Sequence, residues 1–185
     1  MTEDRARELA FVFRCSGAAT LSFLLAQAVG LPHPVWAAMT GVIVGQEKLG
    51  DTRQATLGRF VGTLLGVAIA VLIGLPAEWA GAGNAVKIAL SVALAAVIAR
   101  RHPLVKVCMW TCPIVFLTAT PGLPLWHVGL NRGAEVMLGG VVGTLLHLLV
   151  EIMIKSMTTQ KVVNYSIKDY LMFICFIRIL GLFRL

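Results

Sequence analysis

Residues 57–75 read LGRFVGTLLGVAIAVLIGL, an apolar run whose single charged residue is Arg59. The run approaches the length of about 20 residues that crosses a membrane as a helix. Small residues recur at every fourth position, namely Gly58, Gly62, Gly66 and Ala70. Because small residues let two helix backbones approach closely, the run predicts a membrane-spanning helix packed tightly against a neighbour.

Similar apolar runs occur along the rest of the chain, at about residues 9–29, 34–45, 83–99, 104–120 and 133–154. Hydrophobic residues make up 58% of the chain and charged residues 14%, far from the usual balance of soluble proteins. We therefore expect an all-α membrane protein with six transmembrane helices in residues 1–155. The second run is short, which predicts a helix that is tilted, broken or buried among its neighbours.

Residues 156–185 differ in composition, with no Ala and both tyrosines of the chain. We interpret them as a cytoplasmic tail with an interfacial helix in which Arg178 and Arg184 reach the lipid headgroups. A foreign or frameshifted tail would explain the change equally well.

The cations lie almost entirely on one side of the apolar runs. Lys87 and Arg132 are the exceptions if the N-terminus is cytoplasmic, and the inner flanks then hold Arg5, Arg7, Arg14, Lys48, Arg53, Arg59, Arg100, Arg101, Lys106, Lys155, Lys161, Lys168, Arg178 and Arg184. The positive-inside rule expects this asymmetry of a multi-pass protein. We predict an integral membrane protein with both termini cytoplasmic. The cations follow membrane flanks instead of forming one basic face, which argues against nucleic-acid binding despite the net charge of +7.

Two halves of the chain resemble each other weakly. His33-Pro34 precedes the second run and His102-Pro103 the fifth. Arg59 lies near the start of the third run, and Arg132 lies at the start of the sixth. An alternative alignment matches residues 62–65 with residues 143–146. Three helices in each half predict a 3+3 inverted repeat, as in many secondary transporters, with Arg59 and Arg132 near opposite faces of the membrane. The alternative is chance similarity between Gly- and Leu-rich helices.

The sixth run carries a row at steps of four residues: Glu135, Gly139, Gly143, His147 and Glu151. Its glycines predict close helix packing. Ionisable groups at membrane depth are candidates for function, so His147 and Glu151 are candidates for proton coupling. The alternative is that His147 packs against a neighbouring helix and that Glu151 lies at the membrane interface.

Arg59 and Thr63 are one helical turn apart, and a guanidinium with a nearby hydroxyl can bind a carboxylate. Arg59 could instead be one more cation that reaches the lipid headgroups. Trp36 and Trp110 lie within apolar runs, and we expect Pro113 to interrupt the helix that contains Trp110. An indole beside such a break would suit a planar aromatic ligand, with ordinary packing as the alternative.

Cys108 and Cys112 are one turn apart, but no second pair of ligands accompanies them, so we predict buried thiols and no metal or other cofactor. The sequence has no catalytic serine, zinc-protease or nucleotide-binding motif, so we predict no catalytic residues and no enzyme activity. Without a nucleotide-binding motif, transport would need an ion gradient or a partner.

Residues 30–66, with Gly-Leu-Pro-His-Pro-Val-Trp-Ala-Ala-Met-Thr followed by Arg-x-x-Gly-Thr-Leu-Leu-Gly, resemble the fusaric acid resistance (FUSC) family, which includes aromatic acid exporters. The second half resembles it more loosely, through the stretch 110–118 and through Arg132-x-x-Glu135-x-x-x-Gly139. Many family members add a large cytoplasmic domain, and often a second membrane half, that this sequence does not show. The motif residues by position are Trp36, Thr40, Arg59, Gly62, Thr63, Gly66, Arg132 and Glu135.

The resemblance implies a transporter subunit in the lipid bilayer of the bacterial inner membrane that exports aromatic carboxylic acids or related small organic anions. We expect a proton gradient to drive it, a homo-oligomer to form and a periplasmic adaptor protein to assist. The alternatives are a passive anion channel of the malate type and a membrane scaffold or half-protein that does not transport.

Overall fold

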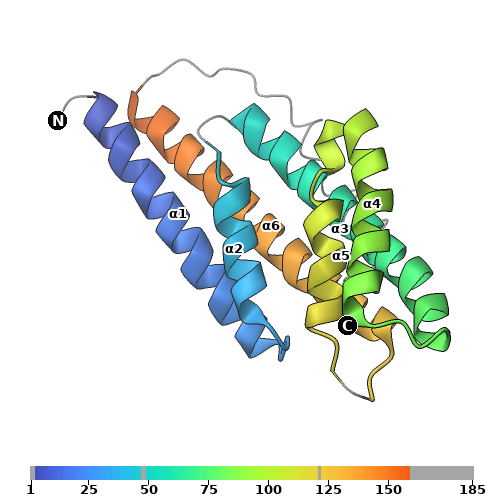
Figure 1. Cartoon of the computed structure of the whole chain (residues 1–185). Coiled ribbons are helices and arrows are strands. Elements are labelled where there is room, and N and C mark those ends of the chain that lie inside the picture. The colour runs from blue at the N-terminus through green and yellow to red at the C-terminus, as the bar shows by residue number, and fades with distance from the viewer. Residues whose placement is uncertain (1–2, 47–48, 121, 159–185) are drawn as a thin grey trace, which may run out of the picture. The chain divides into compact units, whose positions relative to one another are not determined.

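The computed structural model describes residues 3–46, 49–120 and 122–158, and this part of the chain is helical and contains no strand. The elements are α1 (Glu3–Ala28), α2 (Pro34–Val44), α3 (Leu49–Trp79), α4 (Asn84–Arg101), the short 3-10 helix η1 (Pro103–Val105), α5 (Cys108–Leu117) and α6 (Leu125–Thr158) (Figure 1). The predicted all-α class is confirmed. The chain up to Met153 forms one compact unit, to which the following description refers. The expected tail lies outside the described residues from 159 onward.

Three helices are long and apolar enough to cross a membrane, over Glu8–Ala28, Gly50–Trp79 and Leu125–Met153. Shorter apolar helical segments occur at Pro34–Val44 and Pro103–Leu117. A helix therefore lies in each expected apolar run, while the count of six spans stays a prediction.

Three helices begin earlier than their apolar runs, because turns that carry polar or charged residues can belong to a helix that hydropathy alone does not detect. Helix α1 begins at Glu3 instead of 9. Helix α3 begins at Leu49 instead of 57, and α6 begins at Leu125 instead of 133. The early start of α6 places Arg132 within this helix, where it is buried, and not at the beginning of the helix.

Pro113 does not interrupt α5, contrary to the prediction from sequence. The helix runs through it from Cys108 to Leu117, and the change of helix type comes before Cys108, where η1 ends. A proline removes only one backbone donor, and membrane helices tolerate that loss where neighbouring groups compensate.

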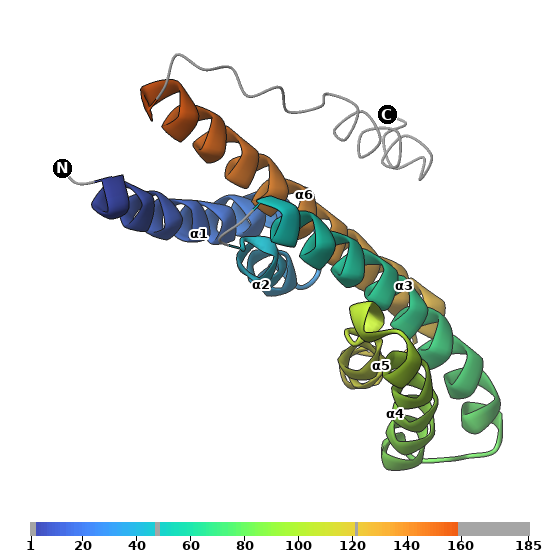
Figure 2. The same cartoon turned by 90° about the horizontal axis from the view of Figure 1, so that it is seen from above.

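The helices form two groups joined by a central pair. Helix α1 packs on α2, while α4 and α5 pack on each other and on α3. Helices α3 and α6 run side by side in opposite directions between these groups (Figures 1 and 2). The third helix of each half therefore packs against the first two helices of the other half, so the polar side chains of α3 and α6 can meet inside the unit.

Glycines permit these close crossings. A Cβ atom at Gly62 would lie 2.9 Å from Cβ of Val107, and one at Gly66 would lie 2.6 Å from Cβ of Thr111. On α6, a Cβ atom at Gly139 would collide with the carbonyl oxygen of Ala37. Gly58 faces the carbonyl of Leu104, and Gly143 faces the carbonyl of Gly41. All five glycines predicted to pack helices thus lie at close helix contacts.

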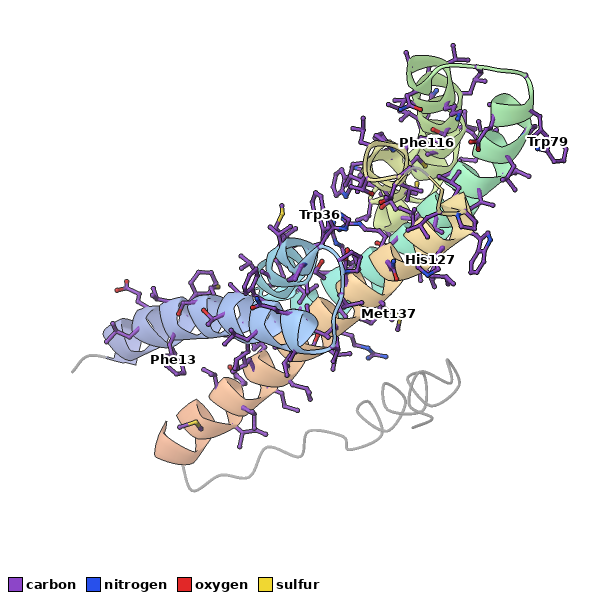
Figure 3. The ribbon with its side chains drawn as sticks, turned by 90° about the horizontal axis from the view of Figure 1, so that it is seen from below. Phe13, Trp36, Trp79, Phe116, His127 and Met137 are labelled. Carbon is purple, nitrogen blue, oxygen red and sulfur yellow. The ribbon has the colours of Figure 1, made fainter. Side chains whose placement is uncertain are left out.

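The outer surface of the unit is rich in apolar side chains, as contact with lipid requires. Phe13 on α1, Leu72 on α3, Val97 on α4 and Leu130 on α6 are all more than half exposed. Trp79, at the end of α3, is 90% exposed and projects away from the helices (Figure 3), as expected of a tryptophan at a membrane interface.

Candidate anion site and polar core

Two buried arginines approach the same face of the short helix α2. The guanidinium carbon of Arg132, on α6, lies 4.0 Å from the centre of the Trp36 ring. Nη2 of Arg59, on α3, donates to Oγ1 of Thr40 at 3.5 Å. Trp36 and Thr40 are one helical turn apart, so the guanidinium groups occupy successive levels along α2. Each arginine is only 3% exposed.

Glu135 is the carboxylate of this cluster and is 1% exposed. Its Oε1 accepts the backbone N–H of His33 at 2.9 Å, and its Oε2 lies 4.0 Å from Nη1 of Arg132. The ring Nδ1 of His33 lies 3.7 Å from Oε1, and this side chain is 40% exposed. The bond from His33 fixes the carboxylate beside the start of α2, on the same side as Trp36.

The cluster has more cationic donors than the described residues satisfy. Arg59 and Arg132 carry two positive charges and Glu135 one negative charge, which leaves one positive charge without a counter-ion in the cluster. Nε of Arg59 and all three guanidinium nitrogens of Arg132 have no hydrogen-bond partner among the described residues, and neither has the buried hydroxyl of Thr63. A buried guanidinium is costly to leave without acceptors. These donors together are suited to binding an anion.

A pocket adjoins Arg132. Its walls come from the loop before α2, the segment between α5 and α6, and the first turns of α6: Pro32, His33, Trp36, Thr118, Thr120, Leu123, Val128, Asn131, Arg132 and Glu135. It has room of about 40 Å³ for water-sized molecules, enough for a small polar group and not for a whole aromatic acid. Figure 3 shows Trp36 projecting from α2 in this region. The pocket thus gives access to Arg132 from one end of the helices.

Some expectations for these residues need correction. Arg59 and Arg132 do not lie near opposite faces of the membrane, because both contact α2. Trp36 already presents one ring face to Arg132, so that face orients a guanidinium and does not stack on a ligand. Trp110, on α5, is 48% exposed and lies outside the pocket wall.

A second buried polar group lies further along α3 and α6. Nδ1 of His147 lies 2.6 Å from Oγ1 of Thr52, and Oγ1 of Thr56 lies 2.9 Å from Oγ1 of Thr144. His147, Thr52 and Thr56 are completely buried. His147 could be predicted from its place in the sixth apolar run, whereas these threonines were not predicted. A signal for them exists, because Thr52, Thr56, Arg59 and Thr63 follow a spacing of four, three and four residues that places them on one face of a helix.

Both cysteines of α5 are buried. The thiol of Cys112 has two backbone carbonyls within reach of its one hydrogen, that of Gly66 at 3.3 Å and that of Cys108 at 3.1 Å. Among the described residues, no group of three His, Cys, Asp or Glu side chains is placed to hold a metal ion. Cys15, Cys108 and Cys112 are free thiols.

Apolar helices that surround a buried cationic cluster define a multi-pass membrane protein with a polar interior. The chain belongs to the family described as fusaric acid resistance protein-like, which matches residues 21–146 and is a family of membrane transport proteins. The match covers the anion cluster and ends just before His147. Comparison with curated proteins and with solved structures finds no match.

Proposed function

We propose that the chain is a transporter subunit of the bacterial inner membrane that exports monovalent aromatic carboxylates, held between Arg59 and Arg132. The observation that carries this proposal is the single uncompensated positive charge of the buried cluster, with its guanidinium donors. A bound carboxylate supplies one negative charge and two acceptor atoms. It would therefore neutralise the cluster and accept from the guanidinium nitrogens, whereas a dianion would leave an excess negative charge.

With both termini cytoplasmic, the start of α2 and the segment before α6 lie on the outer side. The pocket beside Arg132 then opens outward, and Thr40 with Arg59 lies one turn of α2 deeper. We propose that a carboxylate passes between these two levels on its way out. The apolar surfaces of the helices support further contacts, and we propose a homo-oligomer that works with a periplasmic adaptor protein.

We also propose that the two halves form an inverted repeat. His33 and His102 support it, because they precede corresponding prolines with nearly the same backbone angles, φ −132° and ψ 70° against φ −128° and ψ 81°. The helix contacts favour a register that pairs Gly62 with Gly139, since these glycines face corresponding parts of α5 and α2. Arg59 and Arg132 are not equivalent in that register, which agrees with their shared contact to α2.

The test compares variants of Arg59 with a variant of Arg53, an exposed arginine near the start of α3. Arg59→Lys keeps the charge but loses the planar donor pair, and Arg59→Gln loses the charge as well. We expect binding of p-aminohippurate, a monovalent aromatic carboxylate, to weaken by about tenfold for Arg59→Lys and further for Arg59→Gln. Resistance of a sensitised bacterium to fusaric acid should fall in the same order.

Arg53→Gln should change neither binding nor resistance at equal expression. If the Arg59 and Arg53 variants behave alike, Arg59 serves topology and the proposed site is wrong. If the wild-type protein binds malate more tightly than p-aminohippurate, the proposed monovalent substrate is wrong and a channel of the malate type gains support.

A further inference from the structure

His147 lies in a polar environment that no part of the proposed anion site uses. Its ring is completely buried between helices, and Nδ1 lies 2.6 Å from Oγ1 of Thr52. That same oxygen accepts the backbone N–H of Gln46 at 3.0 Å. The turn between α2 and α3 therefore fixes the threonine, and the threonine in turn fixes the orientation of the imidazole.

One further pair of hydroxyls lies between the Thr52–His147 pair and the anion site. Thr56 follows Thr52 by one turn of α3, and its hydroxyl lies 2.9 Å from that of Thr144 on α6. Arg59 follows Thr56 by three residues and is buried on the same side of α3. Buried polar side chains thus follow one another at intervals of about one helical turn along α3, from the level of His147 to the level of Arg59.

The hydroxyl of Thr52 can bond to the ring of His147 in more than one protonation state. Oγ1 of Thr52 accepts from Gln46, so its own hydrogen can be donated to Nδ1 of His147. The hydroxyl can also turn and accept from Nδ1–H, because a hydroxyl oxygen has a second lone pair. Nε2 is buried and has no hydrogen-bond partner among the described residues. Thr52 can therefore form a hydrogen bond with the neutral imidazole and with the imidazolium.

Charged groups surround the ring from two elements. Arg14 on α1 and Glu151 on α6 both act on His147 electrostatically, with opposite signs. Nη2 of Arg14 also donates to the carbonyl of Gln46 at 2.7 Å, which joins α1 to the same turn. Helix α2 carries no ionisable residue, and on α3 the nearby Asp51 and Arg53 are exposed. An added proton on His147 is thus opposed by Arg14 and favoured by Glu151.

We infer that His147 is a proton-carrying site, held by Thr52 and separate from the anion site, through which proton movement is coupled to anion movement. In each cycle a hydronium ion transfers its proton to the neutral imidazole and leaves water, and the imidazolium returns that proton to water on the other side. No bond other than N–H and O–H changes. The coupling to an anion rests on the proposed function, whereas the gain and loss of a proton at His147 does not.

The first experiment uses the full chain in liposomes that contain a pH-sensitive dye, with a gradient of p-aminohippurate across the membrane. His147→Asn retains an amide that can bond to Thr52 but cannot carry a proton. We expect the wild-type protein to change the internal pH as the anion moves, and the Asn variant to give no more pH change than protein-free liposomes. Its exchange of labelled for unlabelled p-aminohippurate at equal pH should continue. A pH change equal to that of the wild type would overturn the inference.

His102→Asn is the matched control, because His102 is exposed at the end of α4 and should leave both fluxes unchanged. The second experiment follows the ¹³C-labelled imidazole of His147 by NMR in a chain with His33→Asn, His102→Asn and His127→Asn. We expect its resonance to titrate within the range from about pH 3 to 8, and Thr52→Val to shift the midpoint.

The two experiments separate the proposals. A ring that stays in one protonation state throughout this range overturns the proton site, whatever the liposomes show. If His147 titrates but the wild-type protein moves no p-aminohippurate, the proton site stands and the proposed substrate is wrong.

Discussion

At Glu135 one carboxylate faces Arg132 and also accepts the backbone N–H of His33, so this residue sets the net charge of the cluster. Glu135→Gln removes a negative charge and keeps an oxygen that can accept from His33. The cluster then carries two uncompensated positive charges. We expect the ratio of malate to p-aminohippurate affinity to rise by roughly tenfold, about 1.4 kcal/mol, as measured by competition binding with purified protein.

Asn131→Ala is the control for this prediction, because Asn131 lines the same pocket and carries no charge. It should leave the ratio unchanged even if it alters both affinities. An unchanged ratio in Glu135→Gln would mean that the carboxylate does not face the bound anion, and would favour a purely structural role for its bond to His33.

Among the helices, α6 offers a direct test of close packing. A Cβ atom at Gly139 would collide with the backbone of Ala37, and backbone cannot move aside as a flexible side chain can. We expect Gly139→Ala to destabilise the fold by about 1–3 kcal/mol, measured by unfolding in mixed detergent micelles.

Gly133 lies on the same helix and is buried, yet a Cβ atom there would meet nothing within 4 Å. Gly133→Ala should be neutral or stabilising by up to about 1 kcal/mol, because alanine favours helix. Equal destabilisation by both substitutions would show that the glycines of α6 matter for chain flexibility and not for contact with α2.

Helix α6 also shows which features of the fold can be predicted from the sequence. Small residues at four-residue spacing are a local property, so the close-packed faces of α3 and α6 could be predicted without a structure. The helices that they contact could not be predicted, because the third helix of each half packs against the other half of the chain. Gly62 on α3 therefore contacts α5, and Gly139 on α6 contacts α2. For the same reason Arg59, Arg132 and Glu135 could be predicted as site residues, whereas the contact of both arginines with α2 could not.

Over the whole molecule, some arginines are buried inside the unit and others are exposed at its surface, and only the exposed ones can contribute to the positive-inside asymmetry. Arg14, Arg59 and Arg132 are each at most 5% exposed, so they cannot act as flank residues that reach lipid headgroups. The remaining described cations still include Arg100, Arg101 and Lys106, which are exposed around the end of α4. The orientation of the chain therefore depends on fewer cations than the sequence alone indicated, and it needs a direct test.

We expect both termini in the cytoplasm, because exposed cations cluster at the connection between α4 and α5. In a chain whose native cysteines are replaced, Gly83→Cys and Ala119→Cys should react with a membrane-impermeant maleimide from outside intact cells. Gly50→Cys and Lys106→Cys should react only after permeabilisation. All four positions are exposed, so a failure to react cannot be ascribed to burial within the unit. Labelling of Gly50→Cys in intact cells would show that the orientation is the opposite of the one expected. The pocket beside Arg132 would then open to the cytoplasm and receive the anion instead of releasing it.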